Sequence, residues 1–220
     1  MPADGTFSRY SLGEEIANSI THGVGIVLAI AGLAVLTAFS ALFGTASHIV
    51  GCSIFGATLI LLYTASTLYH GIRSPRVKRV LRLIDHSAIF LLIAGTYTPF
   101  TLVSLRGPWG WSLFGVIWGL AVLGILFELS PLRRFTVVSI ILYIAMGWVV
   151  IVAIKPLFSA LAPGGLILLF AGGISYTAGV GFYVFDRLPY NHAIWHLFVL
   201  AGSVLHFFAI LFYVVPVAVA

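Results

Sequence analysis

The sequence has very little charge. Of its 220 residues, 8% are Asp, Glu, Lys or Arg, whereas 61% are hydrophobic. A soluble domain carries about 25% charged residues, so this chain has too few polar side chains to cover a water-soluble globule. The net charge of +5 does not indicate nucleic-acid binding, because the basic residues lie in short breaks between apolar segments. We therefore interpret residues 1–220 as one membrane domain.

Cysteine and suitably placed lysine are also lacking. The only cysteine, Cys52, lies inside an apolar run, which excludes an intramolecular disulfide and a cysteine-ligated metal site. We expect Cys52 to be a small buried residue. The last apolar segment contains no lysine, so the chain cannot bind retinal there through a Schiff base.

What the sequence does contain is a series of long apolar segments. A helix needs about 20 apolar residues to cross a bilayer, and the predicted spans are 19–41, 47–69, 84–105, 110–128, 136–154, 164–184 and 193–215. They predict an all-α fold, a seven-transmembrane helix bundle. Pro99 is expected to kink the third span. Two pairs of small residues, Gly115 with Gly119 and Ser175 with Gly179, are predicted to allow close helix approach.

The basic residues predict the orientation of the bundle. Of the eleven Lys and Arg residues, Arg106 and Lys155 fall on one side and the other nine on the opposite side. Short loops rich in Lys and Arg stay in the cytoplasm, so we expect a cytoplasmic N-terminus and an outside C-terminus. A G-protein-coupled receptor has the reverse orientation. Glu128, at an inner helix end, is interpreted as a loop charge, and His48 as a solvated residue of an outer loop.

With this topology, polar side chains from four segments converge at the cytoplasmic depth. They are Glu15, Asn18, His22, Ser66, His70, Asp85, His86, His192 and His196. Ionisable groups within a membrane are costly and are functional candidates. His192 and His196 are four residues apart and therefore project from one helix face. The alternative is a set of histidines that only form hydrogen bonds between helices, which is how we interpret His206.

Three histidines and one open position are typical of a catalytic zinc site, in which a fourth ligand, water, becomes hydroxide near neutral pH. His70, His192 and His196 are the predicted ligands. Asp85 is expected to accept a proton from that water, and Ser66 to donate a hydrogen bond to a developing oxyanion. Glu15, Asn18, His22 and His86 are expected to surround and steady the ligands. Another divalent metal would also suit such ligands.

Four motifs resemble one family along the whole chain. The runs EEIANSITHGVG, STLYH, DHSAI and NHAIWH are similar to those of the hemolysin III type proteins, the bacterial branch of the progestin and adipoQ receptor (adiponectin receptor-like) family. The resemblance implies a seven-helix bundle in the bacterial inner membrane, with zinc near the inner leaflet. It places that zinc on His70, His192 and His196, with Asp85 close by or linked through water. It also implies kinship with membrane hydrolases such as alkaline ceramidases.

Three functions remain open from the sequence. The first is a zinc-dependent hydrolase that cleaves an amide or ester bond in a membrane lipid. The second is a receptor-like sensor of the bilayer or of a lipid ligand, in which zinc is structural. The third is a pore or an ion-coupled transporter, as a lytic, hemolysin-type protein would be. In the first two the expected partner is a membrane lipid, and nucleic acid is not expected.

Overall fold

The computed structural model describes residues 10–185 and 187–215, and the regular structure within them is helical throughout. Seven helical spans in this part of the chain are long and apolar enough to cross a membrane, which confirms the predicted all-α bundle. The first four are α1 (Leu12–Phe43), α2 (Ala46–Gly71), α3 (Pro75–Pro99) with the π-helix Phe100–Leu105 that continues it, and α4 (Gly107–Leu129).

The fifth span is broken into pieces, whereas the last two are single helices. A 3-10 turn, Pro131–Arg134, leads into α5 (Thr136–Gly147), which continues through the 3-10 segment Val149–Ala153 into α6 (Ile154–Ala160). The sixth and seventh spans are α7 (Pro163–Val184) and α8 (Asn191–Tyr213). The label α8 therefore belongs to the seventh span.

Two helices begin well before the predicted spans. Ser11 and Glu14 form a capping box that starts α1 at Leu12, because each side chain accepts a hydrogen bond from the other's backbone N–H. Pro75 occupies the first turn of α3, where the missing proline N–H has no cost. The charged segment after α2 is thus mostly helix, and Asp85 lies nearly three turns inside α3 instead of at its start.

Pro99 ends the regular α-helix of the third span. The six residues that follow it, Phe100–Leu105, form a π-helix before the chain turns at Arg106. Proline removes one backbone hydrogen bond from a helix and crowds the preceding turn, and such positions commonly distort the helix. The expected kink is therefore realised as a change of helix type.

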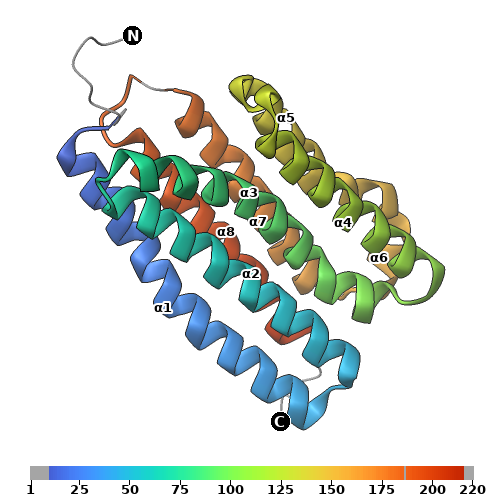
Figure 1. The fold of residues 1–220 in the computed structure, drawn as a ribbon. Coiled ribbons are helices and arrows are strands. Elements are labelled where there is room, and N and C mark those ends of the chain that lie inside the picture. The colour runs from blue at the N-terminus through green and yellow to red at the C-terminus, as the bar shows by residue number, and fades with distance from the viewer. Residues whose placement is uncertain (1–9, 186, 216–220) are drawn as a thin grey trace.

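The spans form a closed bundle. In Figure 1, α1 lies along one edge, followed by α2 and α3, while α4 and α5 lie at the other edge. The helix α8 packs against both α1 and α7 and closes the bundle. The helices α1 and α8 begin, and α2 ends, at the same end of this bundle, which carries His70, His192 and His196 and is called the histidine end below.

The surface of α1 shows which environment the bundle suits. Its outward residues Ile16, Ile20 and Val24 are at least half exposed, whereas Glu15 and Asn18 on the inward face are buried. A helix on the surface of a soluble protein has the opposite arrangement, with polar side chains outside. An apolar exterior around a polar interior is the pattern of a helix that faces lipid.

Close packing of α1 and α2 depends on Gly56. A Cβ atom there would lie 2.6 Å from Cδ1 and 2.7 Å from Cβ of Leu33. We predict that Gly56→Leu lowers the free energy of unfolding by about 1–3 kcal/mol, the usual cost of overpacking. Thermal unfolding in detergent measures it. Gly119→Leu is the matched control, since a Cβ at Gly119 meets nothing within 4 Å. Equal thermal midpoints for the two variants would contradict this account.

The small-residue pairs divide in the same way. Among the described residues, neither Gly115 nor Gly119 approaches another helix within 4 Å of an added Cβ, so the prediction of a close helix approach there is wrong for this structure. A Cβ at Gly179 would lie 2.7 Å from that of Phe198, and Ser175 donates a hydrogen bond to the Phe198 carbonyl. The second pair therefore does bring α7 close to α8.

Candidate metal centre

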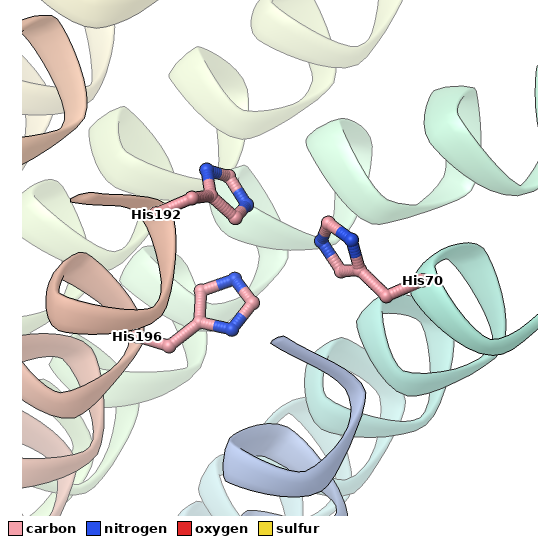
Figure 2. Close-up of side chains that lie close together, drawn as sticks. All are labelled: His70, His192 and His196. Carbon is pink, nitrogen blue, oxygen red and sulfur yellow. The ribbon is translucent and has the colours of Figure 1, made fainter. Parts of the chain in front are cut away.

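Three buried histidines meet at the histidine end. His70 is the penultimate residue of α2, while His192 and His196 occupy the first two turns of α8. Figure 2 shows the His70 ring turned toward the two rings of α8. The candidate ligand atoms of the three side chains all lie within 4.8 Å of one another. Each of these residues is at most 6% exposed.

The first helix holds two of the rings by their Nδ1 atoms. Nδ1 of His70 lies 2.6 Å from Oε2 of Glu15, and Nδ1 of His196 lies 3.2 Å from the Asn18 carbonyl oxygen. Both oxygens are acceptors, so Nδ1 is the donor in each ring. In a neutral imidazole, Nε2 then carries the lone pair that a metal needs.

These Nε2 atoms give a test of whether a metal fits. Neither Nε2 of His70 nor Nε2 of His196 has a hydrogen-bond partner within the described residues, although both atoms are buried. Buried polar atoms normally have partners, and each exception calls for an explanation. A cation at this point would satisfy both lone pairs. The three histidines could therefore hold a metal ion.

The hydrogen bonds around the rings join α1, α2, α3 and α8. Besides its contact with His70, Glu15 lies 2.5 Å from Nζ of Lys78 on α3. Thr21, which hydrogen-bonds to Nδ1 of His196 at 3.1 Å, was not anticipated from the sequence. Neither was Tyr10, whose hydroxyl lies 2.9 Å from Nδ1 of His192. Lys78 was counted only as a topology charge. The adjacent TH motif is a signal that could have identified Thr21.

The side chains of Asn18 and His22, both on α1, also contact the ligand rings. The Asn18 side-chain amide is 3.4 Å from Nδ1 of His70. The His22 ring stacks on that of His196, with centroids 3.5 Å apart and planes within 11°. His22 is 2% exposed. Because the two rings are stacked, His22 limits the rotation of the His196 ring.

Asp85 and Ser66 form a separate pair beside the histidines. Asp85 is 6% exposed and Ser66 1% exposed, and the Ser66 hydroxyl donates a hydrogen bond to the Asp85 carboxyl group. Within the described residues, Asp85 lies outside the group of side chains that could share one ion with the histidines.

An apolar cavity of about 140 Å³ begins at Asp85 and extends along the bundle. Asp85 and His22 line one end of it, and Trp195 contributes from α8. Farther along α8, His206 lines it as well. Most of the remaining wall consists of aliphatic and aromatic side chains from α3, α5, α7 and α8.

His86 faces a different neighbour from Asp85. Its Nδ1 lies 3.9 Å from Oε2 of Glu128 on α4, because adjacent helical residues point about 100° apart. Glu128 is 3% exposed and accepts a hydrogen bond of 2.6 Å from Ser139. The interpretation of Glu128 as a loop charge is therefore wrong. Its place near a helix end concealed that α5 covers it.

The two outlying histidines are both buried. His48 is 5% exposed and lies in the first turn of α2, where its Nδ1 accepts a hydrogen bond from the Thr45 backbone N–H. The expectation of a solvated loop residue is thus wrong, because His48 lies inside α2 and is buried. His206 is the expected interior hydrogen bonder, since its Nε2 donates to the Leu169 carbonyl oxygen at 2.9 Å.

Comparisons with known proteins agree over almost the whole chain. The profile of a family described as "Haemolysin-III related" matches residues 10–207. Hemolysin-3 of Bacillus cereus is 53% identical over 205 residues, which cover 93% of this chain and 94% of the relative. The hemolysin-3 homolog of Bacillus subtilis (strain 168) is 49% identical over 208 residues, or 94% and 98% of the two chains. Human monocyte to macrophage differentiation factor is 29% identical over 215 residues, which cover 95% and 87%.

Proposed function

Because this chain belongs to the haemolysin-III related family of multi-pass membrane proteins, we propose that it binds zinc and hydrolyses an amide or ester bond in a membrane lipid. The observation that carries the proposal is a cluster of three buried, metal-competent histidines, one of which stacks on His22, a residue that lines an apolar cavity together with the buried carboxyl group of Asp85. The histidines suit the metal, the carboxyl group suits proton transfer, and the cavity suits a lipid chain.

Each residue has a defined task in this proposal. His70, His192 and His196 hold the ion, and Glu15 and the Asn18 carbonyl keep two of the rings in the tautomer that presents Nε2. A zinc ion held there supplies Lewis acidity, which polarises a carbonyl group and makes hydroxide available near neutral pH. Asp85 takes up the proton of the attacking water, and Ser66 keeps its carboxyl group aimed.

The substrate class follows from the walls of the site. The bundle exposes apolar side chains on its outside, so a molecule dissolved in the bilayer meets the protein readily. The cavity beyond Asp85 is lined mainly by apolar groups, and such walls accept a hydrocarbon chain and reject a strongly hydrated one. The scissile bond would then lie at the histidine end.

The same proposal assigns the protein to a bacterial cell membrane, with the histidine end in the cytoplasm. The support is the uneven distribution of Arg and Lys. The basic residues Arg76, Lys78, Arg79 and Arg82 lie in the first turns of α3 at the histidine end, whereas Arg106 lies at the opposite end. Basic residues stay on the cytoplasmic side of such proteins.

We predict that purified zinc-loaded protein releases fatty acid from members of a panel of lipid amides and esters. Asp85→Asn should lower this rate about 100-fold or more, the usual contribution of a general base, while the zinc content stays unchanged. His48→Gln is the control, since His48 is a buried histidine at the opposite end of α2. No turnover by zinc-loaded wild type across the panel would remove the hydrolase from consideration.

A structural role of the metal is the second candidate. It is favoured by the position of the histidines, which join the end of α2 to the start of α8, so that a bound ion would clamp two helices distant in the sequence. A receptor-like sensor needs such a clamp but no exchangeable position on the metal. Zinc binding without turnover would support this function.

Because relatives carry the name hemolysin, release of dye from liposomes should be measured in the same experiments to test for a lytic function.

A further inference from the structure

His206, in the far part of the cavity wall, has a buried ring nitrogen that is an acceptor with no donor. His206 is 6% exposed and lines the cavity. Its Nε2 donates to the Leu169 carbonyl oxygen, so Nδ1 of the neutral ring is an acceptor. Nδ1 is buried and has no hydrogen-bond partner among residues 10–185 and 187–215. A buried acceptor left unsatisfied is costly.

The His206 ring cannot easily turn to find another partner. It lies against Gly172 on α7, where an added Cβ would collide with Cδ2 and Nε2 of the ring. The Tyr176 ring is next to it, with centroids 5.5 Å apart. The absence of a side chain at Gly172 therefore makes room for this ring, and the bond to Leu169 sets its direction.

The neighbouring hydroxyl groups do not supply the missing donor. Ser203 donates to the Val199 carbonyl and accepts from Tyr63, so the hydroxyl of Tyr176, 2.8 Å from Ser203, is a donor to it. The other hydroxyl groups that line the cavity also donate to backbone carbonyls: Thr96 to Leu92, Thr177 to Gly173, Tyr97 to Gly147 and Tyr143 to His86. Each of these hydroxyl groups already donates its proton to another acceptor, so none of them is available to donate to His206.

We propose that Nδ1 of His206 accepts a hydrogen bond from a hydroxyl group on the hydrocarbon chain of the lipid that occupies the cavity. His206 is then a specificity-determining residue that favours hydroxylated acyl chains over unsubstituted chains of equal length. This inference rests on the proposed lipid-binding function. Because His206 follows His196 by ten residues, the two lie about 15 Å apart along the helix axis, so the favoured hydroxyl group is in the middle of the chain.

The test is a competition between two ligands for the purified full-length protein in detergent. A fatty acid with a mid-chain hydroxyl group and its unsubstituted parent are supplied in equal amounts, and native mass spectrometry gives the ratio bound. We expect wild type to favour the hydroxylated acid about tenfold, as one hydrogen bond to a buried acceptor allows. A ratio near one would show that water satisfies Nδ1, and it would overturn the proposal. Failure to bind either acid would overturn it too.

Substitutions test whether the His206 ring causes the preference for the hydroxylated acid. His206→Leu removes the acceptor and keeps an apolar wall, so its ratio should fall to about one. Gly172→Ala should lower the ratio as well, because the new methyl group displaces the ring; this variant decides the matter if His206→Leu does not fold. Gly181→Ala is the control on the same helix, where a Cβ meets nothing within 4 Å. A tenfold preference retained by a folded His206→Leu would overturn the proposal.

Zinc content, measured on the same samples, separates this inference from the proposed function. Protein that holds no zinc but still selects the hydroxylated acid would sink the zinc hydrolase and support the role of His206. Zinc-loaded protein that hydrolyses lipids without any preference for hydroxylated chains would support the zinc hydrolase and overturn the role of His206.

Discussion

Replacement of His196 by alanine should abolish tight zinc binding. Purified wild type should carry about one zinc ion per chain, as expected for a single site with three histidine ligands. His196→Ala should lose more than about 100-fold in affinity, since removal of residues that merely support a ligand already costs 10–100-fold. Metal analysis after dialysis measures the loss directly. Lipid hydrolysis should disappear with the metal.

Thermal unfolding gives a second, independent test of zinc binding at His196. A ligand that binds only the folded state raises the unfolding temperature, so zinc should raise the thermal midpoint of wild type but not that of His196→Ala. His48→Gln should respond as wild type does, because His48 is buried at the opposite end of α2. Should His196→Ala keep its zinc, the three histidines would be only a set of hydrogen-bonding side chains.

The second large effect on zinc affinity is expected at Glu15, which is not itself a predicted ligand. Its carboxylate bonds to Nδ1 of His70 and to the Lys78 ammonium group. Glu15→Gln keeps the shape of the side chain but removes the charge that holds the His70 tautomer, and its amide group is a poor partner for Lys78. We expect zinc affinity to fall about 10–100-fold, as for other carboxylates behind a metal-binding histidine. Titration against a competing chelator gives the affinity.

The neighbouring carboxylate is the matched control. Glu14 caps α1 and accepts a hydrogen bond from the Tyr190 backbone N–H. Within residues 10–185 and 187–215 it makes no hydrogen bond or ion pair with the three ligands. Glu14→Gln should therefore lower thermal stability without a change in zinc affinity. Equal affinities for Glu15→Gln and wild type would mean that Glu15 only pairs with Lys78. An equal loss in both variants would indicate a general effect of charge at this end.

Acid should release the metal in wild type. Histidine binds a metal through its neutral form, so protons compete with zinc for each ligand. We expect the bound fraction to fall as the pH is lowered, and to fall at a higher pH in Glu15→Gln than in wild type, because that site binds more weakly. Metal retained on a filter across a pH series tests this. Retention that is independent of pH would exclude histidine ligation.

The part of the site predicted from the sequence depends on local spacing. His192 and His196 lie four residues apart on α8, and the helix places such residues on one face. Their convergence with His70 could be predicted because alternate spans return each helix end to the same side of the membrane. The sequence gives the wrong environment for His48 and Glu128, because both lie at helix ends and only contacts with neighbouring elements, such as the hydrogen bond from Ser139 to Glu128, show that they are buried.

Contacts between helices were outside the reach of the sequence. The sequence marks Lys78 only as one of the basic residues that predict orientation, yet it lies beside Glu15 because α3 begins at Pro75 and runs back along α2. The direction of His86 toward Glu128 likewise depends on how α3 is rotated against α4. Rotation of a helix about its axis is set by packing against its neighbours, which a hydropathy pattern does not record.

The sequence by itself determined that seven apolar helices cross a membrane and which of their ends carry the histidines, because both follow from hydrophobic length and from helical periodicity. Only the tertiary structure decided that Nδ1 of His70 and of His196 is hydrogen-bonded to α1, while Nε2 of each ring remains available to a metal ion. It also decided that Gly172 leaves room for the His206 ring at the cavity wall. Those features depend on distances between atoms of different helices, and close packing in three dimensions fixes such distances.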